Sequence, residues 1–80
     1  MTQSDKNTIE LVLAHAVRRN DKRASAHIAK RNKAINDGAA SGKIEWCNAK
    51  VAEYRQRSAN CTKALESFAH HMNGVALDTK

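Results

Sequence analysis

Apolar residues in the second half of the chain recur at alternating intervals of three and four. The series is Ile44, Cys47, Val51, Tyr54, Ser58, Cys61, Leu65, Phe68, Met72 and Val75. Such a heptad series lines one face of an α-helix and packs against a neighbouring helix. Ser58 is its single strongly polar member. The pattern therefore predicts a helix over about residues 43–73 with one continuous apolar edge.

A less regular apolar stripe runs through the first half of the chain. On a helical wheel one face collects Ile9, Leu13, Ala16, Val17, Ala24, Ile28, Ala34 and Ile35. Asn20, His27 and Arg31 interrupt this face, and such polar positions often set the pairing of helices at some expense in stability. Asn7 or Ser4 is expected to cap the start. The stripe predicts a helix over about residues 5–37.

Glycines mark the boundaries of these segments. They stand at Gly38, Gly42 and Gly74, and the chain has no proline. Because glycine readily adopts positive φ just past a helix, residues 38–42 are predicted as a turn and residues 74–80 as a short tail. A turn this short makes the helices antiparallel and pairs residues whose numbers sum to about 80. Arg31 should then lie near Glu53, and Asn20 near Ser58.

The predicted fold is an all-α, single-domain, long antiparallel helical hairpin. The chain has 80 residues, with one Trp, one Tyr and one Phe, and small chains bury a limited share of their surface. Cys47 and Cys61, 14 positions apart on one helix, would lie ~21 Å apart, too far for a disulfide. Association is the remaining way to complete the core, so we expect a homodimer that forms a four-helix bundle.

This plan resembles that of the Rop family of small plasmid-encoded RNA-binding hairpins. The resemblance lies in a polar start followed by two helices that carry heptad patterns. It implies dimerisation of two hairpins into a four-helix bundle. It assigns no role to any individual residue of this chain.

The charge is strongly basic and unevenly placed. Fourteen Lys and Arg against eight Asp and Glu give a net charge of +6, which favours a polyanionic partner. Within residues 18–33 the basic side chains opposite the apolar stripe are Arg18, Arg19, Lys22, Arg23, Lys30 and Lys33. This face is a candidate for phosphate contacts. A solvated surface and a docking site for an acidic protein are the alternatives.

The second helix carries further candidates for contact with a partner. The basic residues Lys50, Arg55 and Arg57 would extend the cationic surface. Trp46 lies off the heptad edge, near the turn. It either folds over Ala39 and Ala40 to close the hairpin, or stands exposed as a stacking platform or an interface anchor. We expect Trp46 and Arg55 to contact the partner.

Several classes of protein are disfavoured. The residues His15, His27, His70, His71, Cys47 and Cys61 form neither a CxxC nor an HxxxH spacing, so no metal is expected. No glycine-rich phosphate loop and no paired acids on an apolar face occur, so we expect neither an enzyme nor a cofactor. The polar start, MTQSDKNT, and the lack of a long apolar run predict a cytoplasmic protein without membrane association.

Two functions remain from these observations. The first is a small basic helical protein that binds DNA or RNA through its phosphates, with weak sequence selectivity. The alternative is a small adaptor or inhibitor, of the kind that viruses and mobile elements produce, which docks by helix packing onto an acidic or apolar surface of a host protein. The sequence favours the first because charge and apolar residues segregate on the first helix.

Overall fold

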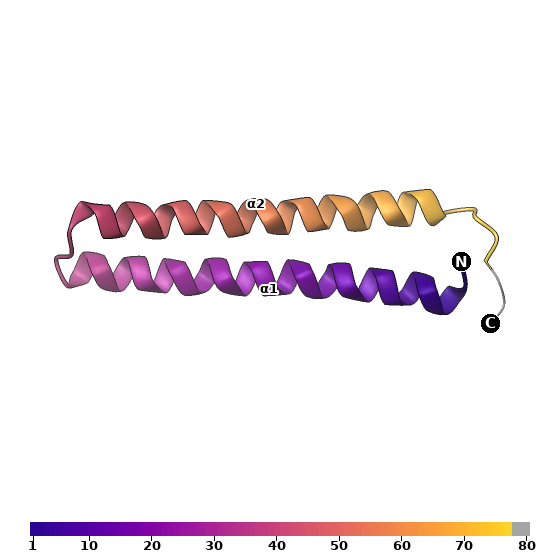
Figure 1. The fold of residues 1–80 in the computed structure, drawn as a ribbon, viewed down its shortest axis with the longest axis horizontal. Helices are drawn as coiled ribbons and strands as arrows, with labels where there is room; N and C mark the ends of the chain where they lie inside the picture. Colours follow the sequence, from indigo (N-terminus) through magenta and orange to yellow (C-terminus); the bar gives the residue numbers. More distant parts are fainter. Residues whose placement is uncertain (78–80) are drawn as a thin grey trace.

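Two long antiparallel helices lie side by side in the computed structural model, which describes residues 1–77. Helix α1 spans Gln3–Asn36 and helix α2 spans Ser41–Met72, with a short turn at one end of the hairpin and the start of α1 and the end of α2 at the other (Figure 1). The molecule measures 59 × 17 × 11 Å. The predicted all-α hairpin is thereby confirmed.

The start of α1 differs from the prediction. Thr2 is the N-cap: its Oγ1 accepts a hydrogen bond from the backbone N–H of Asp5 at 3.1 Å. The Thr2 backbone N–H donates in return to Asp5 Oδ2 at 3.2 Å. This reciprocal capping box satisfies two backbone donors, and it replaces the expected caps Ser4 and Asn7, which lie inside the helix.

Two of the three glycines act as predicted. Gly38 has φ +71° just after α1, and Gly74 has φ +83° just after α2. In the turn the backbone N–H of Ala39 donates to the carbonyl of Ala34 at 2.9 Å. Gly42, in contrast, lies inside the first turn of α2, so the helix begins earlier than residue 43. Val75 lies beyond the end of α2 and is 44% exposed, so it is not part of the helical edge.

The heptad positions of α2 from Ile44 to Met72 all face α1. Each of them is buried or half-buried, and Cys47 is only 1% exposed. The stripe on α1 also faces inward, apart from Ile35, which is 52% exposed. Both cysteines are free thiols, in agreement with their predicted separation along one helix. The sequence periodicity therefore identified the contact faces of both helices.

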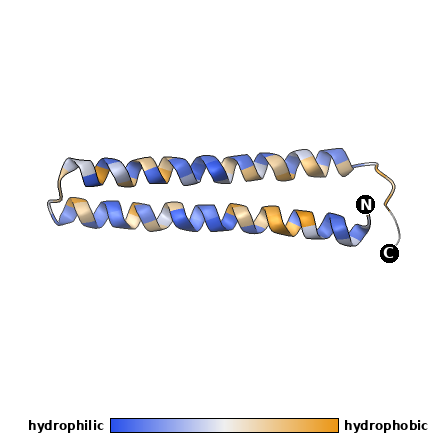
Figure 2. Ribbon diagram, in the orientation of Figure 1, coloured by the Kyte–Doolittle hydropathy of each residue, from blue (hydrophilic) through white to orange (hydrophobic). Residues whose placement is uncertain are grey.

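The two ends of the hairpin are packed to different extents. We call residues 21–58 the turn half, and residues 1–20 with 59–77 the open half. Five of the six buried residues belong to the turn half: Ala24, Ala34, Cys47, Val51 and Ser58. Met72 is the sixth. The strongest apolar colouring on α1 nevertheless lies toward its N-terminus (Figure 2). In the open half the larger apolar side chains on the contact faces are half-buried: Ile9, Leu13, Leu65 and Phe68.

Candidate functional site

The six basic residues singled out on α1 all have exposed side chains. They are Arg18, Arg19, Lys22, Arg23, Lys30 and Lys33, called here the basic face. They point outward because Ala24 and Ala34, on the opposite side of the helix, are buried against α2. Within residues 1–77 none of the six forms an ion pair with a carboxylate. Their charges are therefore available to an external anion.

Arg31 stands apart from the basic face, and its partner differs from the prediction. Its side chain is half-buried between the helices, where Nη1 donates to Asn48 Oδ1 at 3.0 Å. The expected partner Glu53 lies further along α2. Asn20, expected in a polar layer with Ser58, instead donates its side-chain amide to the carbonyl of Ala16 at 2.9 Å. Arg31 is thus bonded across the hairpin to α2, whereas Asn20 is bonded within its own helix.

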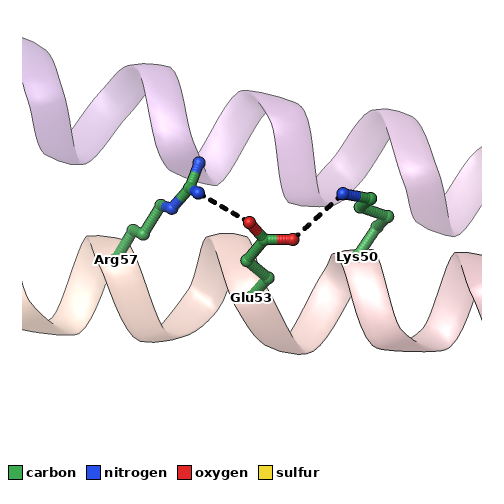
Figure 3. Close-up of polar contacts among 3 residues, drawn as sticks. All are labelled: Lys50, Glu53 and Arg57. Atoms are coloured by element: carbon green, nitrogen blue, oxygen red, sulfur yellow. Dashed lines mark hydrogen bonds and ion pairs between the residues drawn. The ribbon is translucent and has the colours of Figure 1, made fainter.

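Glu53 is occupied by two basic residues of its own helix. Its carboxylate accepts from Lys50 Nζ at 3.2 Å and from Arg57 Nη2 at 2.6 Å (Figure 3). The hydrogen bond from Lys50, reinforced by the charges of Lys50 and Arg57, holds the pKa of Glu53 below its ordinary 4.5. Two of the three predicted basic extensions on α2 are thus partly neutralised. Arg55, the third, is exposed.

A ring cluster crosses from α1 to α2 in the turn half. The imidazole of His27 stacks on Tyr54, with ring centroids 5.5 Å apart and planes 10° from parallel. It also meets Trp46 edge-on, at 5.5 Å and 77°. The guanidinium carbons of Arg23 and Arg57 lie 5.7 and 5.3 Å from the centre of the Tyr54 ring. The cluster fixes aromatic rings directly beside the basic face.

Trp46 combines features of the two predicted arrangements, packing against the turn and standing exposed to a partner. Its side chain is 51% exposed, and Lys50 Nζ lies 5.8 Å from the ring centre. Together with Ala39 it borders a pocket of about 310 Å³ at the turn end of the hairpin. The pocket is lined by Lys30, Lys33, Ala34, Asp37, Ala39, Lys43, Trp46 and Cys47. The indole is therefore held on one side by the hairpin and open on another.

Sequence reasoning missed the ring cluster and the pocket. His27 had been interpreted as an interruption of the apolar stripe, although antiparallel pairing already places it opposite Tyr54. That pairing was the signal that could have found the stack. The pocket had no such signal, because it depends on how the turn brings Lys43 next to Lys30 and Lys33.

Other site types are not seen in the described chain. Among residues 1–77 no three His, Cys, Asp or Glu side chains gather as a metal site would require. Over the same residues neither helix has the length and apolar character needed to cross a bilayer. Comparison with protein-family models, with curated proteins and with solved structures finds no significant match to this chain.

Proposed function

We propose that this protein binds nucleic acid through the basic face of α1, mainly by contacts to phosphates. The observation that carries the proposal is the exposure of six cationic side chains on one face, without carboxylate partners among the described residues. Such a face attracts a polyphosphate backbone, and binding releases the counterions condensed on it. Arg23 lies over Tyr54, which limits its motion and lowers the entropy lost when it binds.

The size of the basic face suits a short stretch of nucleic acid. Arg18 and Lys33 are separated by 15 positions on a continuous helix, which is ~22 Å at ~1.5 Å per residue. A strand of a B-form duplex presents a phosphate about every 3.4 Å along the axis, so this length corresponds to roughly six phosphates. The face is therefore long enough for several simultaneous phosphate contacts.

A salt titration tests the proposal directly. Fluorescence anisotropy with labelled single-stranded and duplex oligonucleotides should show binding at low salt. If about six phosphates are contacted, affinity should fall by roughly a thousandfold between 50 and 200 mM salt. Replacing Arg19 and Lys22 by Gln should flatten that salt dependence while leaving the helix content, measured by circular dichroism, unchanged. Absence of binding at low salt and tens of micromolar protein would contradict the proposal.

A second candidate function is docking onto another protein. Leu11 and Val12 are 56% and 59% exposed, on the outward side of α1 and N-terminal to the basic face. Adjacent exposed aliphatic side chains beside a cationic surface suit an acidic partner with an apolar patch. A stoichiometric protein partner recovered with the wild type and lost with Leu11→Ser/Val12→Ser would support this function. Equal recovery by both proteins would count against it.

Association with a second copy is proposed for the open half. There Ile9, Leu13, Leu65 and Phe68 remain only half-covered in the single hairpin. A four-helix bundle of two hairpins would remove more of their surface from water. Analytical ultracentrifugation should therefore give the mass of a dimer, and a stable folded monomer at micromolar concentration would contradict association.

A further inference from the structure

We propose that the pocket at the turn end receives one nucleotide of a single-stranded nucleic acid, with the base stacked on Trp46 and the phosphate held by Lys30, Lys33 and Lys43. This inference rests on the proposed nucleic-acid binding and adds a specific site to it. The pocket, about 310 Å³ in volume, lies at the small end of the range of ligand sites. It therefore suits a single nucleotide.

The charges around the pocket favour an anion. Three lysines, Lys30, Lys33 and Lys43, are among its lining residues, together with one acidic residue, Asp37. Neither Asp37 nor any of the three lysines forms an ion pair within residues 1–77. The lysines are therefore not neutralised by Asp37, and the lining keeps an excess of positive charge. A phosphate would bridge lysines that come from both helices.

The start of α2 adds backbone donors at the same end of the molecule. Its N-cap is Ala40, which supplies no side-chain hydrogen bond, and its first turn contains no acid. By contrast, the last turn of α1 is closed by hydrogen bonds from Asp37, Gly38 and Ala39 to helix carbonyls. The positive end of α2 therefore lies at the same end of the molecule as the three lysines and adds to the positive potential there.

Trp46 supplies a surface for a base. The edge-on contact with His27 and the nearby ammonium of Lys50 restrain the indole, while half of the side chain stays exposed. A restrained, accessible ring is what base stacking needs, and stacking tolerates any base. Lys30 and Lys33 belong both to the basic face and to the pocket lining. A strand that follows the basic face toward the turn is thereby led to the indole.

Only an unpaired base can reach the ring. The inference therefore concerns single strands, whereas the basic face alone would also hold a duplex. A free mononucleotide shares the same chemistry but gains nothing from the basic face. It should bind at least about tenfold more weakly than a strand of a dozen or so nucleotides, because it makes fewer phosphate contacts.

Trp46 is the single tryptophan of the chain, so its fluorescence reports on the pocket without a label. Titration of the wild type with oligothymidylate should quench this emission, and an abasic oligonucleotide of the same length should bind with little quenching. An abasic strand that quenches equally would overturn base stacking. A mononucleotide that binds as tightly as the strand would overturn the assignment to a strand.

Variants separate this site from the basic face. Trp46→Leu should weaken single-strand binding by about 5- to 100-fold in anisotropy, with duplex binding unchanged, while Trp46→Phe should restore most of the affinity. If Trp46→Leu binds single strands as well as the wild type does, the pocket is not the site, although the proposed function survives. If the wild type binds no nucleic acid at all, both proposals fail.

A matched pair of acid neutralisations provides a second test that leaves Trp46 intact. Asp37→Asn removes the carboxylate from the pocket, and Asp21→Asn makes the same change on α1 outside it. Asp37→Asn should tighten single-strand binding by about two- to fivefold, and by more than Asp21→Asn does. Equal effects of the two variants would mean that only overall charge matters, which would overturn the inference.

Discussion

The turn half and the open half of this hairpin are built on the same periodicity but packed differently. The turn half buries small side chains such as Ala24, Ala34 and Cys47, and adds contacts between helices from His27 and Arg31. The open half has the bulkier apolar side chains, yet only Met72 is buried there. Small residues let two helices close on each other, whereas large ones leave apolar surface that a single neighbour does not cover.

This difference separates the pocket from the proposed dimer contact along the length of the molecule, whereas the basic face extends into both halves. The ring cluster, the pocket and the ion-paired Glu53 all lie in the turn half, which also holds five of the six buried residues among residues 1–77. The half-buried residues Ile9, Leu13, Leu65 and Phe68 lie at the other end, where a second copy is proposed to bind.

The largest expected effect concerns Phe68 in the open half. Phe68→Ala costs ~3–5 kcal/mol when the ring is fully buried, and less when it is half-buried, as in the single hairpin. If a second copy covers the ring, the loss in chemical denaturation should approach the full value and depend on protein concentration. Val51→Ala in the turn half is the control, since Val51 is 6% exposed and its cost should not vary with concentration.

The two cysteines allow the same substitution to be compared in both halves. Cys47→Ser places a hydroxyl where the side chain is 1% exposed, and an unsatisfied buried hydroxyl costs about 1–3 kcal/mol. Cys61→Ser, at a half-buried position of the open half, should cost less than ~1 kcal/mol because water can reach the hydroxyl. Urea unfolding of both variants measures the difference. Equal losses would contradict the tighter packing of the turn half.

A smaller effect is expected at the N-cap of α1. Thr2→Ala removes the acceptor for the Asp5 N–H and should cost about 1 kcal/mol, seen as faster amide exchange in the first turn only. Two hydrogen bonds from Thr2 hold the pKa of Asp5 below its ordinary 3.8. The bond from the Thr2 backbone N–H has the larger effect, and the bond with the Thr2 hydroxyl has the smaller one. This stabilisation is complete above pH 3.8 and is lost as the pH falls through the lower folded-state pKa.

Circular dichroism at decreasing pH measures that loss. Wild-type helicity should decline as Asp5 becomes protonated, and Thr2→Ala should show a weaker decline because its carboxylate has lost one of these partners. The ring contacts of the turn half should not change with Thr2→Ala. A matching change in Trp46 emission would mean that the two halves do not behave independently.

The smallest effect is expected from Glu53. Glu53→Gln frees Lys50 and Arg57 from their exposed ion pairs, which contribute little to stability, so the melting temperature should hardly change. Nucleic-acid affinity should rise about two- to fivefold at low salt because two cations become available beside the basic face. Glu66 lies in the open half and has no ion pair among residues 1–77. Glu66→Gln should therefore raise nucleic-acid affinity less than Glu53→Gln does. Equal gains would show that position along the hairpin is irrelevant to binding.

The sequence by itself determined the helices, their antiparallel pairing and the side that each turns toward the other. Those features follow from local periodicity and from the positive φ of Gly38, and neither needs knowledge of distant residues. The exposure of the six basic residues followed as well, because a side chain opposite a buried stripe has nowhere else to point.

Tertiary structure alone decided which polar groups meet and where the packing is complete. Arg31 donates to Asn48 and not to Glu53 because of the axial offset between the two helices. A heptad pattern does not specify that offset. The pocket requires three lysines from two helices to converge at the turn. The unequal burial of the two ends depends on how closely the two helix backbones approach each other. The sizes of the side chains that face each other set that distance, and which side chains face each other is known only once the helices are paired.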